Sequence, residues 1–181
     1  MQPARFLDDT LSELCDEAHY LFTPADLKSL LPRMSDSAFG SLLSRTVQSG
    51  TLERLCRGLY LRTQDAPNDG LLLFRAAARL RAACFNYISL ETALSDAGVI
   101  SQVLPNRITL MSSGRSNEIE CGRWGVIEFV HTRQRPNQIA GELSYDARCG
   151  LWRASVDLAL RDMRATRRDT GLVNWSDDEL V

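Results

Sequence analysis

Residues 23–62 read TPADLKSLLPRMSDSAFGSLLSRTVQSGTLERLCRGLYLR, and this stretch decides the fold that the sequence predicts. It contains two helix start signals. At Thr23 a capping hydroxyl precedes a proline, and an acid follows three residues after the cap. At Ser35 a second hydroxyl precedes residues 36–49, in which apolar residues recur along one face. Gly50 suits the position just past a helix end, so two short consecutive helices are predicted.

The flanking segments complete a pattern. After Gly50 we predict two short strands, joined by a turn at residues 56–58. Before Thr23, the apolar residues of segment 6–22 recur at steps of three and four, which predicts an amphipathic helix. Three helices followed by a β-hairpin are typical of a winged helix-turn-helix, which we predict over residues 1–64.

The second half begins after a polar segment. Residues 65–70 read DAPNDG and are rich in turn formers, which predicts a linker. Helices are expected at 71–84, at 90–97 after a cap at Ser89, and at 152–164 with Trp152 on the packed face. Strands are expected at 107–111, 118–121 and 125–131. Residues 71–181 are therefore predicted to form a mixed α+β domain, and the fold class of the chain is α+β.

The composition fits one ordinary domain or two small ones. The 181 residues carry a net charge of -2, and 44% are apolar, which argues against global disorder. No apolar run approaches the roughly 18–20 residues that span a bilayer, and the N-terminus has no apolar signal core. We therefore expect a cytoplasmic protein with no membrane partner.

Cysteine and histidine usage argues against a metal site or a disulfide framework. The five cysteines are spread out without any C-x-x-C pair, and there are only two histidines. We predict neither a metal site nor a cofactor.

No catalytic motif is found in the sequence. It has no G-x-G-x-x-G, no phosphate-loop G-K-[ST], no H-E-x-x-H and no G-x-S-x-G. Because Lys28 is the only lysine, the E-x-K site of restriction-type nucleases is excluded in its usual form. His131 with Cys121 or Cys149 could form a nucleophile pair, but a buried cysteine and a strand-end histidine are far commoner. We predict that the protein is not an enzyme.

Positive charge is concentrated in the segment with the DNA-binding pattern. Residues 23–62 carry a net charge of +3, from six basic and three acidic residues, in a chain of net charge -2. The helix at 36–49 would lie in the major groove, where arginine can pair with guanine and glutamine with adenine. The predicted DNA contacts are Ser35, Ser37, Ser41, Ser44, Arg45 and Gln48 on this helix, and Arg54 and Arg57 on the hairpin.

A second basic cluster follows the last predicted helix. It consists of Arg161, Arg164, Arg167 and Arg168. Most such clusters are solvated helix surfaces, and a partner-docking patch or a second DNA contact is the functional alternative. Further on, a capping box at 176–179 lies just before Val181, which suggests either a truncated sequence or a tail that a partner orders.

Four segments together resemble a known family. They are LFTPADL at 21–27, LERLCRGLY at 52–60, YISLETALSDAG at 87–98 and QVLPNRITL at 102–110. In this order and spacing they resemble the AbiEi-type antitoxins, and the resemblance covers residues 21 to about 132. By this match residues 57–60 are the wing and 36–49 the reading helix.

The resemblance implies a component of a type IV toxin–antitoxin system. In that family the winged helix binds inverted repeats in its own promoter and represses it. The C-terminal domain is needed to neutralise the AbiEii toxin, a nucleotidyltransferase-like enzyme, directly or indirectly. No catalytic residue carries over from the family. Two copies on double-stranded DNA are expected, because one small winged domain buries little DNA surface.

Three alternatives stay open. The first is a stand-alone winged-helix transcription factor whose second domain binds a ligand or a protein. The second is a protein-binding module with a degenerate winged helix. The third is an enzyme acting through the second domain, for which the sequence offers no constellation of residues.

Overall fold

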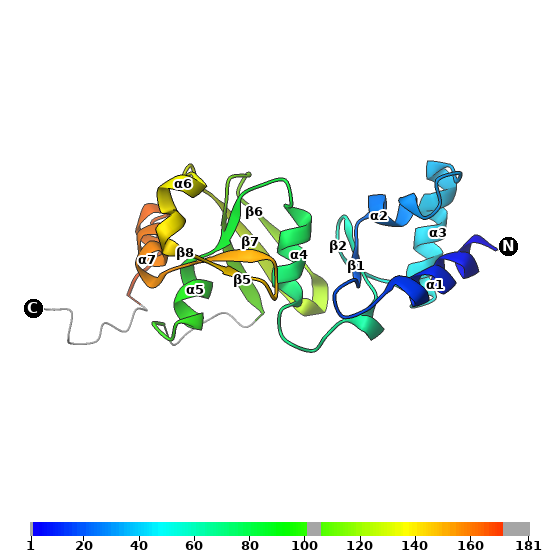
Figure 1. Cartoon of the computed structure of the whole chain (residues 1–181), viewed down its shortest axis with the longest axis horizontal. Helices are drawn as coiled ribbons and strands as arrows, with labels where there is room; N and C mark the ends of the chain where they lie inside the picture. Colours follow the sequence, from blue (N-terminus) through cyan, green and yellow to red (C-terminus); the bar gives the residue numbers. More distant parts are fainter. Residues whose placement is uncertain (1, 101–105, 172–181) are drawn as a thin grey trace, which may run out of the picture. The chain divides into compact units, whose positions relative to one another are not determined.

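The computed structural model describes residues 2–100 and 106–171. Helices and strands occur in both halves of the chain, so the fold is mixed α+β (Figure 1). The chain divides into two compact units, Met1–Leu72 (unit 1) and Leu73–Val181 (unit 2). Within the described ranges, no helix has the length and apolar character needed to cross a membrane. The predicted capping box at 176–179 lies outside the described residues.

Unit 1 combines helices with a small antiparallel sheet. Its elements are α1 (Pro3–Leu14), β1 (Leu21–Phe22), α2 (Pro24–Ser29), α3 (Asp36–Gln48), β2 (Glu53–Cys56), β3 (Leu59–Leu61) and a 3-10 turn at Thr63–Asp65. The strand order is β1-β3-β2. Leucines from α1, α2 and α3 form one buried cluster that holds the three helices together.

The predicted helix starts are confirmed. The Thr23 hydroxyl accepts from the Asp26 amide at 3.2 Å, and the Asp26 carboxylate accepts from the Thr23 amide at 2.7 Å. Ser35 caps α3, accepting from the Ala38 amide at 3.4 Å. Gly50 follows α3 with a φ of 79°, which glycine adopts without steric cost.

The prediction of one helix over 6–22 is wrong. The helix α1 ends at Leu14, because the Asp16 carboxylate accepts from the amides of Ala18 and His19, both at 2.8 Å. Leu21 and Phe22 then pair with β3 as a strand. A local side-chain bond and a distant strand partner together override the helical spacing.

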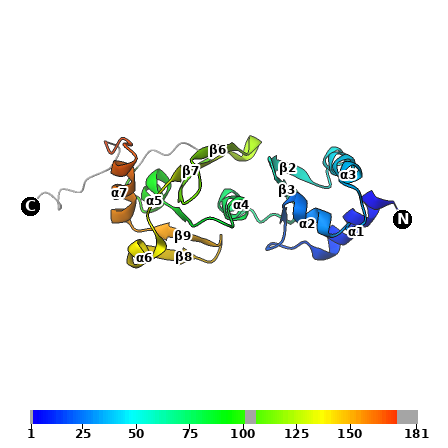
Figure 2. The same ribbon diagram turned by 90° about the horizontal axis from the view of Figure 1, so that it is seen from above.

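Unit 2 is built on a six-stranded mixed sheet with the order β6-β7-β5-β4-β9-β8. Figure 2 labels the outer pairs of this sheet, β6 with β7 and β8 with β9. Its strands are β4 (Asn86–Ile88), β5 (Arg107–Ser112), β6 (Asn117–Glu120), β7 (Val126–His131), β8 (Leu143–Asp146) and β9 (Leu151–Ala154). Its helices are α4 (Leu72–Leu80), α5 (Leu90–Asp96), α6 (Pro136–Ile139) and α7 (Val156–Ala165), with 3-10 turns at Gly122–Trp124 and Ala140–Glu142. The pairs β5–β7 and β4–β9 are parallel, and the other pairs are antiparallel.

The predicted strand at 107–111 and the hairpin around 122–124 are confirmed, but β4 and β8 were not predicted. The predicted helix at 152–164 is also partly wrong, because Leu151–Ala154 is a strand and α7 starts only after Ser155. The Ser155 hydroxyl caps α7 by accepting from the Leu158 amide at 3.2 Å. Trp152 therefore lies on a strand, 41% exposed, with its ring 5.2 Å from that of Tyr145.

The two faces of the sheet contact different helices. On one face, the guanidinium of Arg81, the residue after α4, lies 4.0 Å from the Phe129 ring centroid. On the other face, α7 is anchored by Asp162, which is fully buried. Its carboxylate accepts from Tyr87 (3.0 Å), Ser89 (2.7 Å) and Gln134 (2.9 Å). The Ser89 hydroxyl thus donates to Asp162 of α7. The side-chain cap that the sequence predicted for Ser89 at the start of α5 is therefore not formed.

Candidate nucleic-acid interface

The helix α3 separates a buried face from a polar one. Phe39, Leu42 and Leu43 are buried against the rest of unit 1. The predicted DNA contacts on this helix are all exposed: Ser35, Ser37, Ser41, Ser44, Arg45 and Gln48. The 3.6-residue period of the helix places the last four on one side, away from the core.

The serine hydroxyls of α3 are partly engaged by their own helix. Ser41 donates to the carbonyl of Ser37 and Ser44 to that of Gly40, both at 3.1 Å. In this state their oxygens are free to accept, which suits the amino groups of adenine or cytosine. Donating to a phosphate would require each hydroxyl to release its helix carbonyl. Ser35 is likewise occupied as the cap of α3.

Arg45 and Gln48 carry the strongest base-reading chemistry on this face. The Arg45 Nε lies 3.4 Å from the Ser41 carbonyl, a long bond that leaves both terminal nitrogens of the guanidinium available. Two such nitrogens can pair with the N7 and O6 acceptors of guanine. Gln48 lies three residues further on the same helix face, where its amide can pair with adenine.

The β2–β3 hairpin presents two exposed arginines. Arg54 lies on β2 opposite Tyr60, and Arg57 lies in the turn before Gly58, whose φ is 86°. Among the contacts of the described residues, neither arginine has a carboxylate partner. Both guanidinium groups are therefore available for phosphate oxygens.

Fewer of the positive charges in residues 23–62 are available to bind DNA than the sequence suggests. Arg62 is buried, and its Nε lies 3.3 Å from the Asp65 carboxylate. Lys28 is 3.0 Å from the carboxylate of Asp36, the acid at the start of α3. Four of the six basic residues remain on the surface without such partners: Arg33, Arg45, Arg54 and Arg57.

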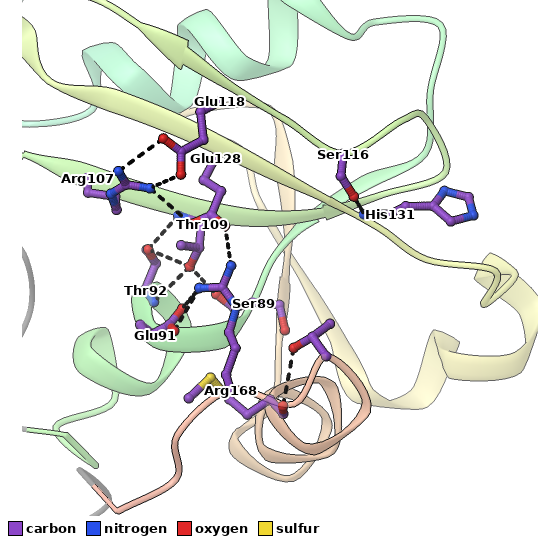
Figure 3. Close-up of polar contacts among 12 residues, drawn as sticks. Ser89, Glu91, Thr92, Arg107, Thr109, Ser116, Glu118, Glu128, His131 and Arg168 are labelled. Atoms are coloured by element: carbon purple, nitrogen blue, oxygen red, sulfur yellow. Dashed lines mark hydrogen bonds and ion pairs between the residues drawn. The ribbon is translucent and has the colours of Figure 1, made fainter.

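The second predicted basic cluster is half neutralised. Arg161 makes two hydrogen bonds to the Glu142 carboxylate, at 2.8 and 2.7 Å. Arg168 bonds Glu91 at 2.8 Å and also contacts Glu128 (Figure 3). Arg164 and Arg167 stay exposed. As a surface for an anionic partner, the predicted four-arginine cluster thus has only two available charges.

The histidine–cysteine pair is not assembled. Cys121 bonds Gly125 at the beginning of β7, whereas His131 ends that strand, so about 20 Å separate them. Cys149 precedes β9, three strands away in the sheet order, or at least about 14 Å. The His131 Nδ1 lies 2.8 Å from the carbonyl of Gly114 instead.

No model of a known protein family matches this chain, and no curated protein sequence matches it. Among the described residues, no three His, Cys, Asp or Glu side chains gather as a metal site.

One group of basic residues was missed by the sequence analysis. Arg115, His131 and Arg133 are exposed where β5 and β7 end together. The available signal was the lack of acids in segments 111–117 and 129–138, but only the strand register shows that these segments are neighbours.

Proposed function

We propose that unit 1 is a winged helix-turn-helix that binds double-stranded DNA, with α3 in the major groove and the β2–β3 hairpin as the wing. The observation that carries this proposal is the exposed row Ser41, Ser44, Arg45 and Gln48, opposite the buried face of α3. The unpaired arginines of the adjoining hairpin suit phosphate contacts beside the groove.

We further propose that the chain is a non-enzymatic antitoxin and autorepressor of the AbiEi type, acting in the cytoplasm. It would bind inverted repeats in its own promoter as two copies, and neutralise a nucleotidyltransferase-like toxin directly or indirectly. The support is the order of helices and hairpin in unit 1, together with the family resemblance of residues 21–132. A separate mixed α+β unit is available for the second task.

Arg45→Ala is expected to weaken binding to the true operator by about 1–3 kcal/mol, because one bidentate base contact is lost. Fluorescence anisotropy with the operator and with a scrambled duplex measures this. The loss should be confined to the operator, so that the preference between the duplexes falls. Arg33→Ala, which removes an exposed arginine outside the outer face of α3, is the matched control. Unchanged operator affinity would remove Arg45 from the base-reading residues.

Arg57→Ala is expected to weaken binding to every duplex alike, because a wing arginine contacts phosphate and not a base. The slope of log affinity against log salt should become shallower by about 0.9, the share of one phosphate contact. A salt titration on operator and scrambled DNA measures both slopes. A loss restricted to one sequence would contradict the phosphate assignment.

The antitoxin role has its own test. If a gene for a nucleotidyltransferase-like toxin adjoins this gene, its expression alone should arrest growth and co-expression of this chain should restore it. Arg45→Ala should still restore growth when both genes are driven from a foreign promoter, because neutralisation is assigned to unit 2. Failure of the wild type to restore growth would favour the stand-alone transcription factor.

A further inference from the structure

The strand register of unit 2 brings two acid-free segments to one end of the sheet. The parallel strands β5 and β7 end together, with Ser112 in register with His131. The loop 113–116 and the segment 132–135 therefore leave the same end. We call the exposed basic side chains there the basic end: Arg115, His131, Arg133 and Arg135.

A partly buried arginine adds charge beneath this surface. The Arg81 Nη1 donates to the Ser112 hydroxyl at 2.9 Å, and Nη2 donates to the Arg115 carbonyl at 2.5 Å and to the Asn117 side chain. All these acceptors are neutral, and the described contacts of Arg81 include no carboxylate. Burial lowers the pKa of Arg81, as expected for a cation that has lost water without gaining a counter-charge. An anion bound nearby would supply that counter-charge.

The loop at the basic end is held in place by hydrogen bonds. The Gly114 amide donates to the Ser112 hydroxyl at 3.1 Å, and the His131 amide donates to the Ser116 hydroxyl at 2.8 Å. Because a carbonyl only accepts, the His131 Nδ1, 2.8 Å from the Gly114 carbonyl, carries the proton. The ring points away from the sheet, which leaves Nε2 toward solvent (Figure 3). The basic end is thus preorganised.

Other arginines of unit 2 are neutralised by acids. Carboxylate partners are recorded for Arg107, Arg148, Arg153, Arg161 and Arg168. By contrast, no carboxylate of the described residues pairs with Arg115, Arg133 or Arg135. Among the described residues, the basic end thus groups three exposed arginines without a carboxylate partner, against two, Arg164 and Arg167, at the end of α7.

We propose that the basic end binds the phosphate backbone of a nucleic acid. This inference goes beyond the proposed function, because it places a separate nucleic-acid contact in unit 2. A nucleic acid is favoured over an acidic protein because the exposed neighbours are serine, asparagine and glutamine, which contact phosphates. A protein interface is centred on aromatic or aliphatic anchors, and the exposed Tyr145 and Trp152 lie on the β8–β9 hairpin at the other edge of the sheet.

The test compares two double variants with equal loss of charge. Arg115→Ser with Arg133→Ser removes two charges from the basic end, and Arg164→Ser with Arg167→Ser removes two exposed charges from the end of α7. Affinity is measured on upstream and scrambled duplexes between about 50 and about 200 mM salt. The first pair should make the slope of log affinity against log salt shallower by about 1.8, and the second should leave it unchanged. Arg115→Lys with Arg133→Lys should keep the wild-type slope, which separates charge from folding.

A wing variant, Arg54→Ser with Arg57→Ser, distinguishes this inference from the proposed function. If the wing variant weakens binding and the basic-end variant behaves like the α7 control, the inference is overturned and the proposed function stands. If only the basic-end variant weakens binding, the inference stands and the assignment of unit 1 is wrong. If the wild-type chain binds no duplex, both are overturned.

Discussion

Replacing Asp162 by alanine is expected to destabilise unit 2 by about 3–5 kcal/mol. The carboxylate is fully buried and accepts hydrogen bonds from Tyr87, Ser89 and Gln134. Its removal leaves two buried donors, Tyr87 and Ser89, and the partly buried Gln134 amide without this acceptor, and it opens a cavity between α7 and β4. The large cost comes from this loss of several partners at once.

Urea unfolding followed by tryptophan fluorescence measures the effect, because all three tryptophans lie beyond residue 72 and none lies in unit 1. The control is Asp157→Ala, an exposed acid in the first turn of α7. It should lose only about 0.5 kcal/mol, through the helix dipole. Equal losses in the two variants would show that Asp162 does not anchor α7.

Asp162 is also expected to make the stability of unit 2 depend on pH. Burial raises the pKa of Asp162 above 3.8, and hydrogen bonds from Ser89 and Tyr87 offset this only in part. The folded carboxyl therefore holds its proton more tightly than the unfolded one, and its contribution to stability is lost as the pH rises through the folded pKa. Relative to Asp162→Asn, the wild type should lose stability from about pH 4 towards neutrality. Parallel pH profiles of the two proteins would contradict this.

Arg62→Ala is expected to destabilise unit 1 by about 3 kcal/mol. The guanidinium is almost fully buried, and its Nη2 donates to the Ser12 hydroxyl at 2.9 Å, which joins β3 to α1. Its contact with Asp65 is electrostatic, since the Oδ2 atom at 3.3 Å lacks hydrogen-bond alignment. Truncation leaves this half-buried carboxylate without its cation.

Hydrogen exchange of the α3 amides measures the stability of unit 1, which has no tryptophan. Arg54→Ala is the matched control, because Arg54 lies on the same hairpin but is exposed, and its loss should change stability by no more than about 0.5 kcal/mol. If Arg62→Ala leaves the protection of α3 at the wild-type level, the buried arginine does not hold α1 to the sheet.

Local signals predicted the helix starts well. Thr23 and Ser35 cap their helices through side-chain bonds within three residues, so the information lies in adjacent sequence. The missed strand β4 depends on distant partners, since it pairs with β5 and β9, whereas the missed strand β8 pairs with β9, the next strand along the chain. Ser89 illustrates the same limit, because its hydroxyl bonds Asp162, which is 73 residues away.

Charge was harder to predict than helix position. From the sequence, Arg161 and Arg168 are predicted to be surface charges. In the structure Glu142 pairs with Arg161 and Glu91 with Arg168, and both acids come from other parts of the chain. Conversely, the basic end exists only because β5 and β7 are parallel and end together. Exposure on α3 was predictable, since the helical period alone separates its buried and polar faces.

The most direct test of the central claim, that unit 1 reads DNA, is fluorescence anisotropy on DNA from immediately upstream of the gene. A scrambled duplex of equal length is the control, at about 50 and about 200 mM salt. We expect a preference of about a hundredfold or more for the upstream DNA, and affinity that falls with salt on both duplexes. Absence of binding to either duplex would contradict the account and make the chain a protein-interaction module.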